Sequence, residues 1–395
     1  MSKPVLAIVG TGWGAYPLTQ QVSLDLYDIK VISPVRTLQY TPLLASAACG
    51  HFDFRLAEEP IKRQHRPTLQ YFKATAEEID FDKRVITCKP FVDDLARTPE
   101  PFKVEYDLLV LAPGCEVQTF DTPGVNEHAL FLRNTNEARI LQQRILQMLD
   151  AASLPGLTEQ QQKDVLHIRV VGGGAIGVEA VAELYDLWYE ALRHLYNHLD
   201  GKVEMSIHDV APRVLGSFHQ ELSDYAMRSL KAKNIEVKTE SHIEKVDEHA
   251  IYTKEDGRLP YGLLLWATGT KAINLVENLE VKKPEEGMPR ILTDGYLHVL
   301  RPDGTKMEDV FALGDAADIE GNSLPTLAEV ALQKGEYLVT ELNKESRNQR
   351  TPFEYTQGAS LAYLGGGKGV RGGTEATDFK GEAGKSPSRT IQSIC

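Results

Sequence analysis

Two glycine-rich turns, GTGWGA at 10–15 and GGGAIG at 172–177, constrain this chain more than any other feature. Each follows a short apolar run, 5–9 or 167–171, that has the length of a buried strand, and each precedes a helical pattern. In dinucleotide-binding folds the first glycine makes a tight turn, the second admits a pyrophosphate, and the third position packs helix on strand. One match is weak evidence, but two in the same setting predict two dinucleotide-binding units.

The residues expected to contact the first dinucleotide are those of its turn: Gly10, Gly12, Trp13, Gly14 and Ala15. The residues expected to contact the second lie in the corresponding turn: Gly172, Gly174, Ala175, Ile176 and Gly177. The alternative for either turn taken alone is a plain glycine turn of an α/β sheet, with no ligand.

In a dinucleotide-binding unit, the chain continues from the glycine turn through a helix to a second strand, and the residue at the end of that strand selects the nucleotide. In the second unit Asp209 is placed to accept hydrogen bonds from ribose hydroxyls and to repel a 2′-phosphate, which predicts NADH rather than NADPH. The alternatives are a solvated loop aspartate and a site adapted to NADPH by the nearby Arg213. In the first unit Ser33 stands at the equivalent position, so a different dinucleotide is expected there.

Strands alternating with helices predict an α/β protein with two doubly wound, Rossmann-like domains. The expected segments are, in order, 1–150 with a returning 291–350, a polar linker 151–164, the second domain 165–290, and a short region 351–365. Helices are expected over 134–150, over 178–199 and from about Thr326. The glycine-rich, aperiodic residues 366–395 predict a disordered tail.

Composition excludes several classes. The formal net charge of −13 argues against nucleic acid or an anionic membrane surface as an electrostatic partner. No apolar run approaches the roughly 20 residues that span a bilayer, and the first strand leaves no room for a presequence. The four cysteines form no close pair, so neither a metal site nor a redox disulfide is expected.

Further segments carry a family resemblance. "DVFALGDAA" resembles the FAD-binding segment of flavin enzymes with a glutathione-reductase-like pair of domains, and "LVLAPG" and "LLWATG" resemble their crossover turns. With "GTGWGA", "TPLL", "VVGGGAIGVEAVAEL", "LPTLAEVALQKGEYL" and "GASLAYLG", the chain resembles type II NADH dehydrogenases over about 5–365. These are single-subunit, non-proton-pumping NADH:quinone oxidoreductases of respiratory membranes.

The resemblance implies that the first turn holds FAD non-covalently, the second holds NADH, and the electrons pass to a quinone. Besides the first turn it implies these FAD contacts: Ser33, Thr41, Pro42, Leu43, Ala112, Pro113, Gly114, Gly314, Asp315 and Ala328. For NADH it adds Glu179, Thr268 and Gly269. Glu179 would lie near the nicotinamide and flavin, and Glu329 and Gln333 on a helix beside the quinone.

Two of these residues could instead serve only to stabilise a helix. Glu329 replaces a glutamine of the family pattern, and Thr326 with Glu329 also reads as a helix capping box. Glu179 reads equally as a favourable acid in the first turn of a helix.

The family continues after "SLAYLG" into a helical membrane-docking segment that residues 366–395 do not match, so we expect this chain not to dock. The family implies a peripheral protein of the mitochondrial inner membrane, but the sequence shows no pattern of a presequence or anchor, so a cytoplasmic location is the open alternative. Two other functions remain open: a soluble FAD-dependent tailoring oxidoreductase, and a truncated non-catalytic paralogue or faulty gene model. The oligomeric state, monomer or homodimer, is open too.

Overall fold

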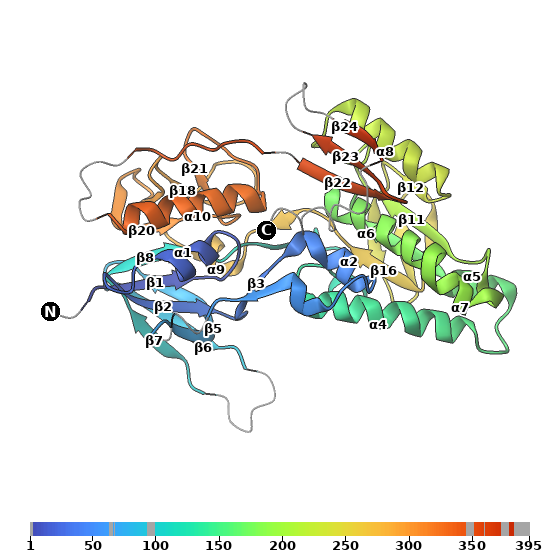
Figure 1. Ribbon diagram of the computed structural model, residues 1–395, viewed down its shortest axis with the longest axis horizontal. Coiled ribbons are helices and arrows are strands. Elements are labelled where there is room, and N and C mark those ends of the chain that lie inside the picture. Colours follow the sequence, from blue (N-terminus) through green and yellow to red (C-terminus); the bar gives the residue numbers. More distant parts are fainter. Residues whose placement is uncertain are drawn as a thin grey trace. The chain divides into compact units, whose positions relative to one another are not determined.

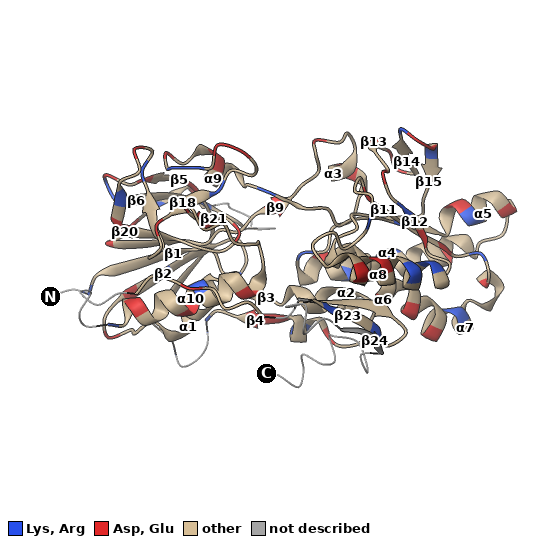
Figure 2. Ribbon diagram, turned by 90° about the horizontal axis from the view of Figure 1, so that it is seen from above, with Lys and Arg blue, Asp and Glu red and all other residues tan. Residues whose placement is uncertain are grey.

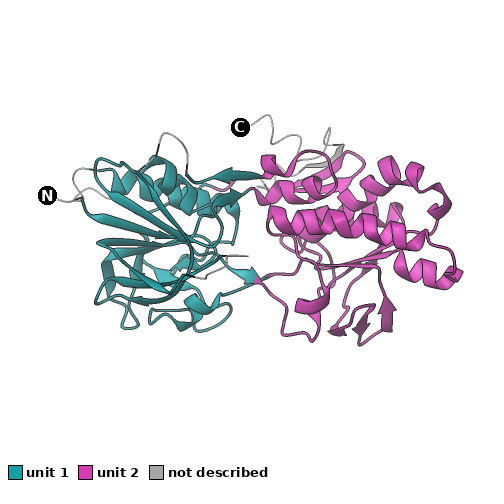
Figure 3. Cartoon of the chain, turned by 90° about the horizontal axis from the view of Figure 1, so that it is seen from below, with its two compact units in different colours: residues 1–39, 58–116, 270–356 teal, residues 40–57, 117–269, 357–395 magenta. Residues whose placement is uncertain are grey.

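The structure, a computed structural model, describes residues 3–62, 66, 68–92, 99–344, 351–358, 360–372 and 379–382. The chain forms two compact units, each assembled from three separate segments (Figure 3). Unit 1 comprises residues 1–39, 58–116 and 270–356, and unit 2 comprises residues 40–57, 117–269 and 357–395. Residues 40–57 and 117–150, expected in the first domain, therefore belong to unit 2, and residues 270–290 belong to unit 1.

Unit 1 is built on one large sheet (Figure 1). Its elements are β1 (Val5–Val9), α1 (Ala15–Gln21), β2 (Asp28–Ser33), β3 (Thr37–Gln39), β4 (Glu58–Pro60), β5 (Gln70–Asp80), β6 (Val85–Pro90), β7 (Phe102–Glu105), β8 (Leu108–Leu111), β17 (Thr270–Lys271), α9 (Asn274–Asn278), β18 (Ile291–Thr293), β19 (His298–Leu300), β20 (Lys306–Ala312), β21 (Ala317–Ile319) and α10 (Ala328–Leu342). Strand β9 (Glu116–Val117) spans the boundary between the units.

The strand order in this sheet is β21-β18-β19-β20-β8-β1-β2-β5-β6-β7, and the central strands β20-β8-β1-β2-β5 run parallel. Val9 aligns with Ile32 on one side and with Leu111 on the other, so three strands end at the same edge. Helices α1 and α10 pack against each other, as Figure 1 shows. The parallel centre confirms the predicted α/β class, and the antiparallel outer strands extend it.

Unit 2 contains a smaller parallel sheet, β12-β11-β10-β16, and two three-stranded antiparallel sheets. Its elements are η1 (Thr41–Leu43), α2 (Leu44–Ala48), η2 (Phe54–Ala57), α3 (Val125–His128), α4 (Thr135–Ala152), α5 (Glu159–Val165), β10 (His167–Val171), α6 (Ala175–Asp186), η3 (Leu187–Leu192), α7 (Arg193–Leu195), η4 (Asn197–Leu199), β11 (Glu204–His208), α8 (Gln220–Ala232), β12 (Glu236–Lys238), β13 (Ile243–Val246), β14 (Ala250–Thr253), β15 (Gly257–Pro260), β16 (Leu263–Trp266), β22 (Ser360–Gly365), β23 (Lys368–Gly372) and β24 (Phe379–Glu382).

The long helix expected over 178–199 is present as a helical run from Ala175 to Leu195, which is α-helical to Asp186, π-helical in η3 and α-helical again in α7. Two other expectations about local structure were wrong. The polar linker 151–164 is largely helical, because α4 runs to Ala152 and a capping box at Thr158 starts α5. Within the tail, 368–372 and 379–382 form strands β23 and β24; residues 373–378 and 383–395 lie outside the described part.

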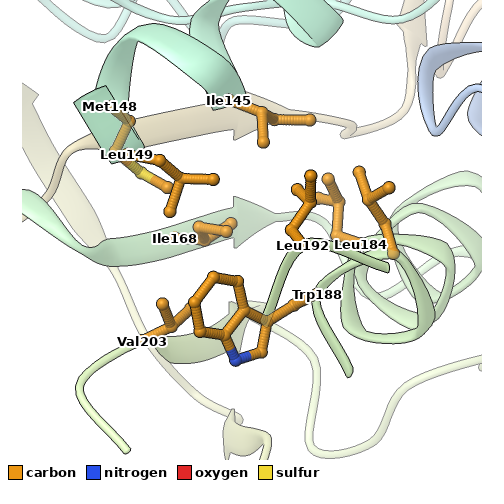
Figure 4. A pocket seen from close by; sticks show the side chains of 9 residues that line it. Ile145, Met148, Leu149, Ile168, Leu184, Trp188, Leu192 and Val203 are labelled. Atoms are coloured by element: carbon orange, nitrogen blue, oxygen red, sulfur yellow. The ribbon is translucent and has the colours of Figure 1, made fainter. Parts of the chain in front are cut away.

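Unit 2 holds a small apolar pocket at Trp188 (Figure 4). It is lined by side chains of α4, β10, α6, η3 and the residue before β11: Ile145, Met148, Leu149, Ile168, Leu184, Leu187, Trp188, Leu192 and Val203. Since no charged group lines it, we assign it to packing between these elements rather than to chemistry.

Acidic and basic residues are interspersed along helices such as α5 and α8 (Figure 2). In the described part of the chain, no helix combines the length and apolarity needed to cross a bilayer. The same residues include no group of three or more His, Cys, Asp or Glu side chains that could hold a metal ion.

Candidate functional site

The first glycine turn is held tightly against the sheet. Gly10 has φ +109°, a conformation that side chains rarely adopt, and its N–H donates to Ile32 O at 2.9 Å. A Cβ at Gly10 would lie only 2.0 Å from Ala112 O. This position therefore needs glycine, because the chain after β1 passes directly over the chain after β8.

Gly12 and Gly14 face different surroundings. No described atom lies within 4 Å of where a Cβ of Gly12 would be, and this residue is exposed. A Cβ at Gly14 would lie 2.1 Å from Leu313 Cδ1, and one at Gly335 would lie 2.3 Å from Gly14 O. Gly12 thus leaves open space where a ligand backbone could approach, whereas Gly14, predicted as a ligand contact, brings α1 and α10 together.

Ser33, at the end of β2, is tied to the first turn. Its Oγ lies 3.1 Å from Thr11 Oγ1 and accepts the Val35 N–H at 3.2 Å. Thr11 Oγ1 in turn donates to Val35 O at 2.8 Å. The Ser33 side chain therefore shapes the loop after β2 together with Thr11, which the sequence patterns did not single out.

The second crossover in unit 1 brings Asp315 to the same sheet edge. Strands β8 and β20 are parallel neighbours, and the turns Ala112–Gly114 and Gly314–Asp315 follow them directly. Cys115 Sγ donates to Asp315 Oδ2 at 3.4 Å, and Arg290 Nε donates to Asp315 O at 3.2 Å. Ligands of open α/β sheets bind at the carboxyl ends of such strands. Cys115 and Arg290 were not predicted from sequence, because no motif marks them.

Helix α10 begins at Ala328, and the capping box expected at Thr326 does not form. The N-cap residue is Leu327, and no described side chain caps it. Glu329 lies in the first turn, where its Oε1 accepts the Gln333 Nε2–H at 3.3 Å. Gln333 also exchanges two hydrogen bonds with the Thr356 backbone, at 2.9 and 3.0 Å. Gln333 thus anchors residues 351–358, and its predicted catalytic role remains a prediction, as does that of Glu329.

The second glycine turn repeats the geometry of the first. Gly172 has φ +113°, and a Cβ there would lie 2.3 Å from Ala267 O in the turn after β16. A Cβ at Gly177 would lie 1.9 Å from Gly172 O, so this glycine permits close packing of α6 on β10. No described atom lies within 4 Å of where a Cβ of Gly174 would be, so Gly174 matches Gly12.

Asp209 follows β11 and faces the second turn. Its Oδ2 accepts the Gly173 N–H, and its Oδ1 accepts the Ala211 N–H at 2.7 Å. A carboxylate has about four acceptor positions, so two remain for ribose hydroxyls. The strand-and-turn pattern predicts Asp209 here, but not its hydrogen bond to the glycine turn.

Thr268 and Gly269 lie in the turn after β16, at the edge of the parallel sheet where the second glycine turn also lies. The Thr268 hydroxyl donates to Gln118 O, and the Gln118 N–H donates to Gly269 O at 2.8 Å. These bonds hold the turn after β16 to the residue that follows β9. Ala175 and Ile176 begin α6, where Ile176 is 49% exposed.

Three acids lie along α6, at Glu179, Glu183 and Asp186. Desolvation, opposed by a hydrogen bond from Tyr363 N and reinforced by the Glu183 charge, raises the pKa of Glu179 to about 8. Tyr363 N lies 3.2 Å from Glu179 Oε1, and Tyr363 Oη donates to Asp186 Oδ2 at 2.6 Å. Strand β22 therefore covers this face of the helix.

Glu183 makes its hydrogen bonds on the α2 side. It accepts from Ser46 Oγ at 2.6 Å, and its other oxygen lies 3.0 Å from His51 Nε2. Glu183 and Asp186 were missed because their spacing looks like an ordinary amphipathic helix. Thr41, Pro42 and Leu43 form η1 of unit 2, with Thr41 and Pro42 exposed, and their place along a flavin stays a prediction.

The family model "Pyridine nucleotide-disulphide oxidoreductase" matches residues 4–335. An internal alternative NAD(P)H-ubiquinone oxidoreductase A1, mitochondrial, of Solanum tuberosum is 32% identical over 402 residues, covering 96% of this chain and 79% of that protein. A probable NADH dehydrogenase of Dictyostelium discoideum is 32% identical over 370 residues, covering 92% and 80%.

The fold also matches a solved structure, NDH2 from Plasmodium falciparum in complex with NADH. The TM-score is 0.87 at 22% identity, and the match covers 100% of this chain and 94% of that one. At this identity the match supports the fold. The sequence matches establish that this chain belongs to the pyridine nucleotide-disulphide oxidoreductase family, and within it to the type II NADH dehydrogenases.

Proposed function

We propose that this chain is an FAD-dependent, non-proton-pumping NADH:quinone oxidoreductase, in which unit 1 binds FAD and unit 2 binds NADH. The proposal rests on one observation. The two units have equivalent glycine turns, but different residues stand at the ends of the neighbouring strands β2 and β11. Asp209 faces the turn of unit 2, whereas Ser33 stands at that position in unit 1. Two related sites with unlike ribose environments suit two different dinucleotides.

The residues of unit 1 fit FAD. The open space over Gly12 would admit a pyrophosphate to the backbone, and Gly114 likewise has no described atom within 4 Å of where its Cβ would be. Asp315 keeps one carboxylate oxygen beyond its bond to Cys115, and this oxygen can accept from a ribityl hydroxyl. Bound FAD would supply the hydride and electron chemistry, and the protein supplies orientation.

The residues of unit 2 fit NADH. Gly174 leaves room at the start of α6, a helix of 12 residues whose first N–H groups and dipole favour a pyrophosphate. Asp209 would accept from the ribose hydroxyls and disfavour a 2′-phosphate through its charge. NADH is therefore the proposed donor, although relatives carry the name NAD(P)H.

Glu179 is proposed to hold a proton for the reaction. Reduction of a quinone to a quinol takes two electrons and two protons; the hydride of NADH accounts for both electrons and one proton, so one further proton is needed. With a pKa of about 8, Glu179 is mostly protonated at neutral pH, while its Oε1 accepts from Tyr363 N. The carboxyl can thus donate a proton to the acceptor and regain it from water.

We extend the mitochondrial setting in the names of several relatives to this chain. The test begins with the visible spectrum of the purified protein, which should show flavin released by denaturation. NADH should bleach it, and a soluble short-chain quinone should restore it. A protein that stays colourless after incubation with FAD would exclude this function, and turnover with dyes but with no quinone would favour a different acceptor.

A further inference from the structure

Lys334 is a buried lysine for which the described residues provide no hydrogen-bond acceptor. It lies on α10, is 1% exposed, and its Nζ donates to none of the described residues. Desolvation lowers its pKa to about 8. A charged lysine at such a site lowers the stability of the fold unless an acceptor or an anion lies beside its ammonium, because burial removes the water that would otherwise solvate it.

The nearby carboxylate of Asp318 attracts this ammonium but has no free acceptor position for it. The four donors that Asp318 accepts are Arg290 Nη1 at 2.8 Å, Ser323 Oγ at 2.6 Å, and the N–H groups of Ile319 at 3.0 Å and Leu324 at 3.1 Å. Arg290 also repels the ammonium. The hydrogen-bond partner of the lysine must therefore come from elsewhere.

The remaining charge that acts on the ammonium belongs to Asp315, at the sheet edge described above. The residue after the lysine, Gly335, packs against the first glycine turn, where a Cβ would lie 2.3 Å from Gly14 O. Lys334 therefore belongs to the stretch of α10 that adjoins the turn, and the charge of Asp315 in the same unit acts on its ammonium.

We propose that Lys334 is a cofactor-binding residue, whose ammonium donates hydrogen bonds to oxygen atoms in the ribityl and pyrophosphate part of FAD. This rests on the proposed function, which assigns FAD to unit 1. The pyrophosphate carries negative charge, and a charge-assisted hydrogen bond to it would supply the partner that the described residues do not provide.

Proton uptake provides a signature of this contact. The charged groups that act on Lys334 are Asp318, Arg290 and Asp315, and the balance of their effects and burial places its pKa at about 8. An anionic ligand beside the ammonium raises that pKa. At pH 8 the wild-type apoprotein should therefore take up roughly half a proton per FAD bound, because about half of the lysines are neutral beforehand.

The test titrates apoprotein with FAD at pH 8 by calorimetry, in two buffers of unlike ionisation enthalpy, so that the bound protons are counted. Lys334→Met should abolish the uptake and weaken FAD binding about tenfold or more. Lys103→Met, at an exposed lysine of β7 in the same unit, is the matched control and should behave as wild type.

A thermal melt of the apoproteins checks folding. Lys334→Met should raise the apoprotein melting temperature, since it removes a buried charge. Added FAD should then raise the melting temperature of this variant by less than it raises that of the wild type. Unchanged FAD affinity and proton uptake in this variant would overturn the assignment of Lys334 while leaving FAD binding intact. Failure of the wild type to bind FAD would instead overturn the proposed function.

Discussion

The carboxylate of Asp209 accepts the backbone N–H of Gly173, so the residue expected to select the ribose also holds the glycine turn in place. Its other oxygen accepts the Ala211 N–H. In the proposed function, nucleotide selection and the shape of the turn therefore depend on the same carboxylate of unit 2. In unit 1 the corresponding link runs from Ser33 to Thr11 through neutral hydroxyls.

Asp209→Asn should lower the preference for NADH over NADPH about tenfold, because it removes the charge that repels a 2′-phosphate. An amide can accept from only one of the two backbone donors, so the variant should also lose about 1–3 kcal/mol of stability. The ratio of kcat/KM for the two nucleotides and a urea melt measure these effects. Glu244→Gln, at an exposed acid of β13, is the control. A wild type that already prefers NADPH would contradict the assignment.

Gly10→Ala and Gly12→Ala should separate folding from cofactor binding. Gly10→Ala places a Cβ 2.0 Å from Ala112 O at positive φ and should cost about 2–4 kcal/mol. Gly12→Ala meets no described atom within 4 Å and should leave the apoprotein as stable as wild type while weakening FAD binding. Melting curves with and without FAD measure both. Wild-type FAD affinity in Gly12→Ala would show that the pyrophosphate does not approach this residue.

Glu179 should make stability fall as the pH rises. Its folded-state pKa of about 8 lies above the ordinary 4.5, so the folded protein holds more protons between these values. The free energy of unfolding therefore decreases from about pH 4.5 to pH 8 through this group. Glu179→Gln should remove that decrease, which urea unfolding across this range will show as a difference between the two profiles. Parallel profiles would mean that the acid ionises normally.

His208 should have the opposite effect to Glu179 and make the protein less stable as the pH falls. It is buried in a polar cluster, with its Nε2 3.2 Å from Arg169 Nη1 and its Nδ1 3.1 Å from Ser241 Oγ. Desolvation, and then the charge of Arg169, lower its pKa from 6.5 to about 3, so the folded state resists protonation. Stability present above pH 6.5 is lost as the pH falls towards 3, on the order of 3 kcal/mol by about pH 4. His208→Gln should flatten this acid limb, and an unaltered limb would place the effect elsewhere, for example at His167.

Glu329→Gln should raise the flavin reduction potential, if this first-turn acid lies near the flavin as the family resemblance implies. A carboxylate disfavours the extra negative charge of reduced flavin, and its removal relieves that repulsion. The melting temperature should stay unchanged, because Glu329 caps nothing and an amide oxygen can still accept from Gln333. Dye-coupled potentiometry measures the potential. An unaltered potential would place Glu329 away from the flavin.

Periodic patterns predicted the parallel centre of both sheets and the glycine turns well. Gly10 and Gly172 were recognisable because a turn at positive φ against a neighbouring strand admits little else. Asp209 was recognisable because its place is fixed by strand length.

Residues whose role depends on distant segments could not be predicted. Lys334 reads as an ordinary helical lysine until the fold buries it, and Cys115 meets Asp315 across 200 positions. Residues 40–57 pack in unit 2 through α2 and α4, a contact that no local pattern encodes. The strands in 368–372 and 379–382 were missed because glycine-rich composition favours disorder, whereas the pairing of β23 with β22 and of β24 with β23 overrides it.

The pairing of β20 with β8 has a consequence for synthesis of the chain. Roughly 200 residues separate the two strands, so at about 5–20 residues per second the first half of the large sheet waits on the order of 10–40 s for its partner. During that interval the edge of β8 that β20 will cover is unpaired, while residues 117–269 emerge and can begin to fold. The nascent chain should therefore need a chaperone, or early folding of that inserted segment, to keep this edge from pairing with other chains.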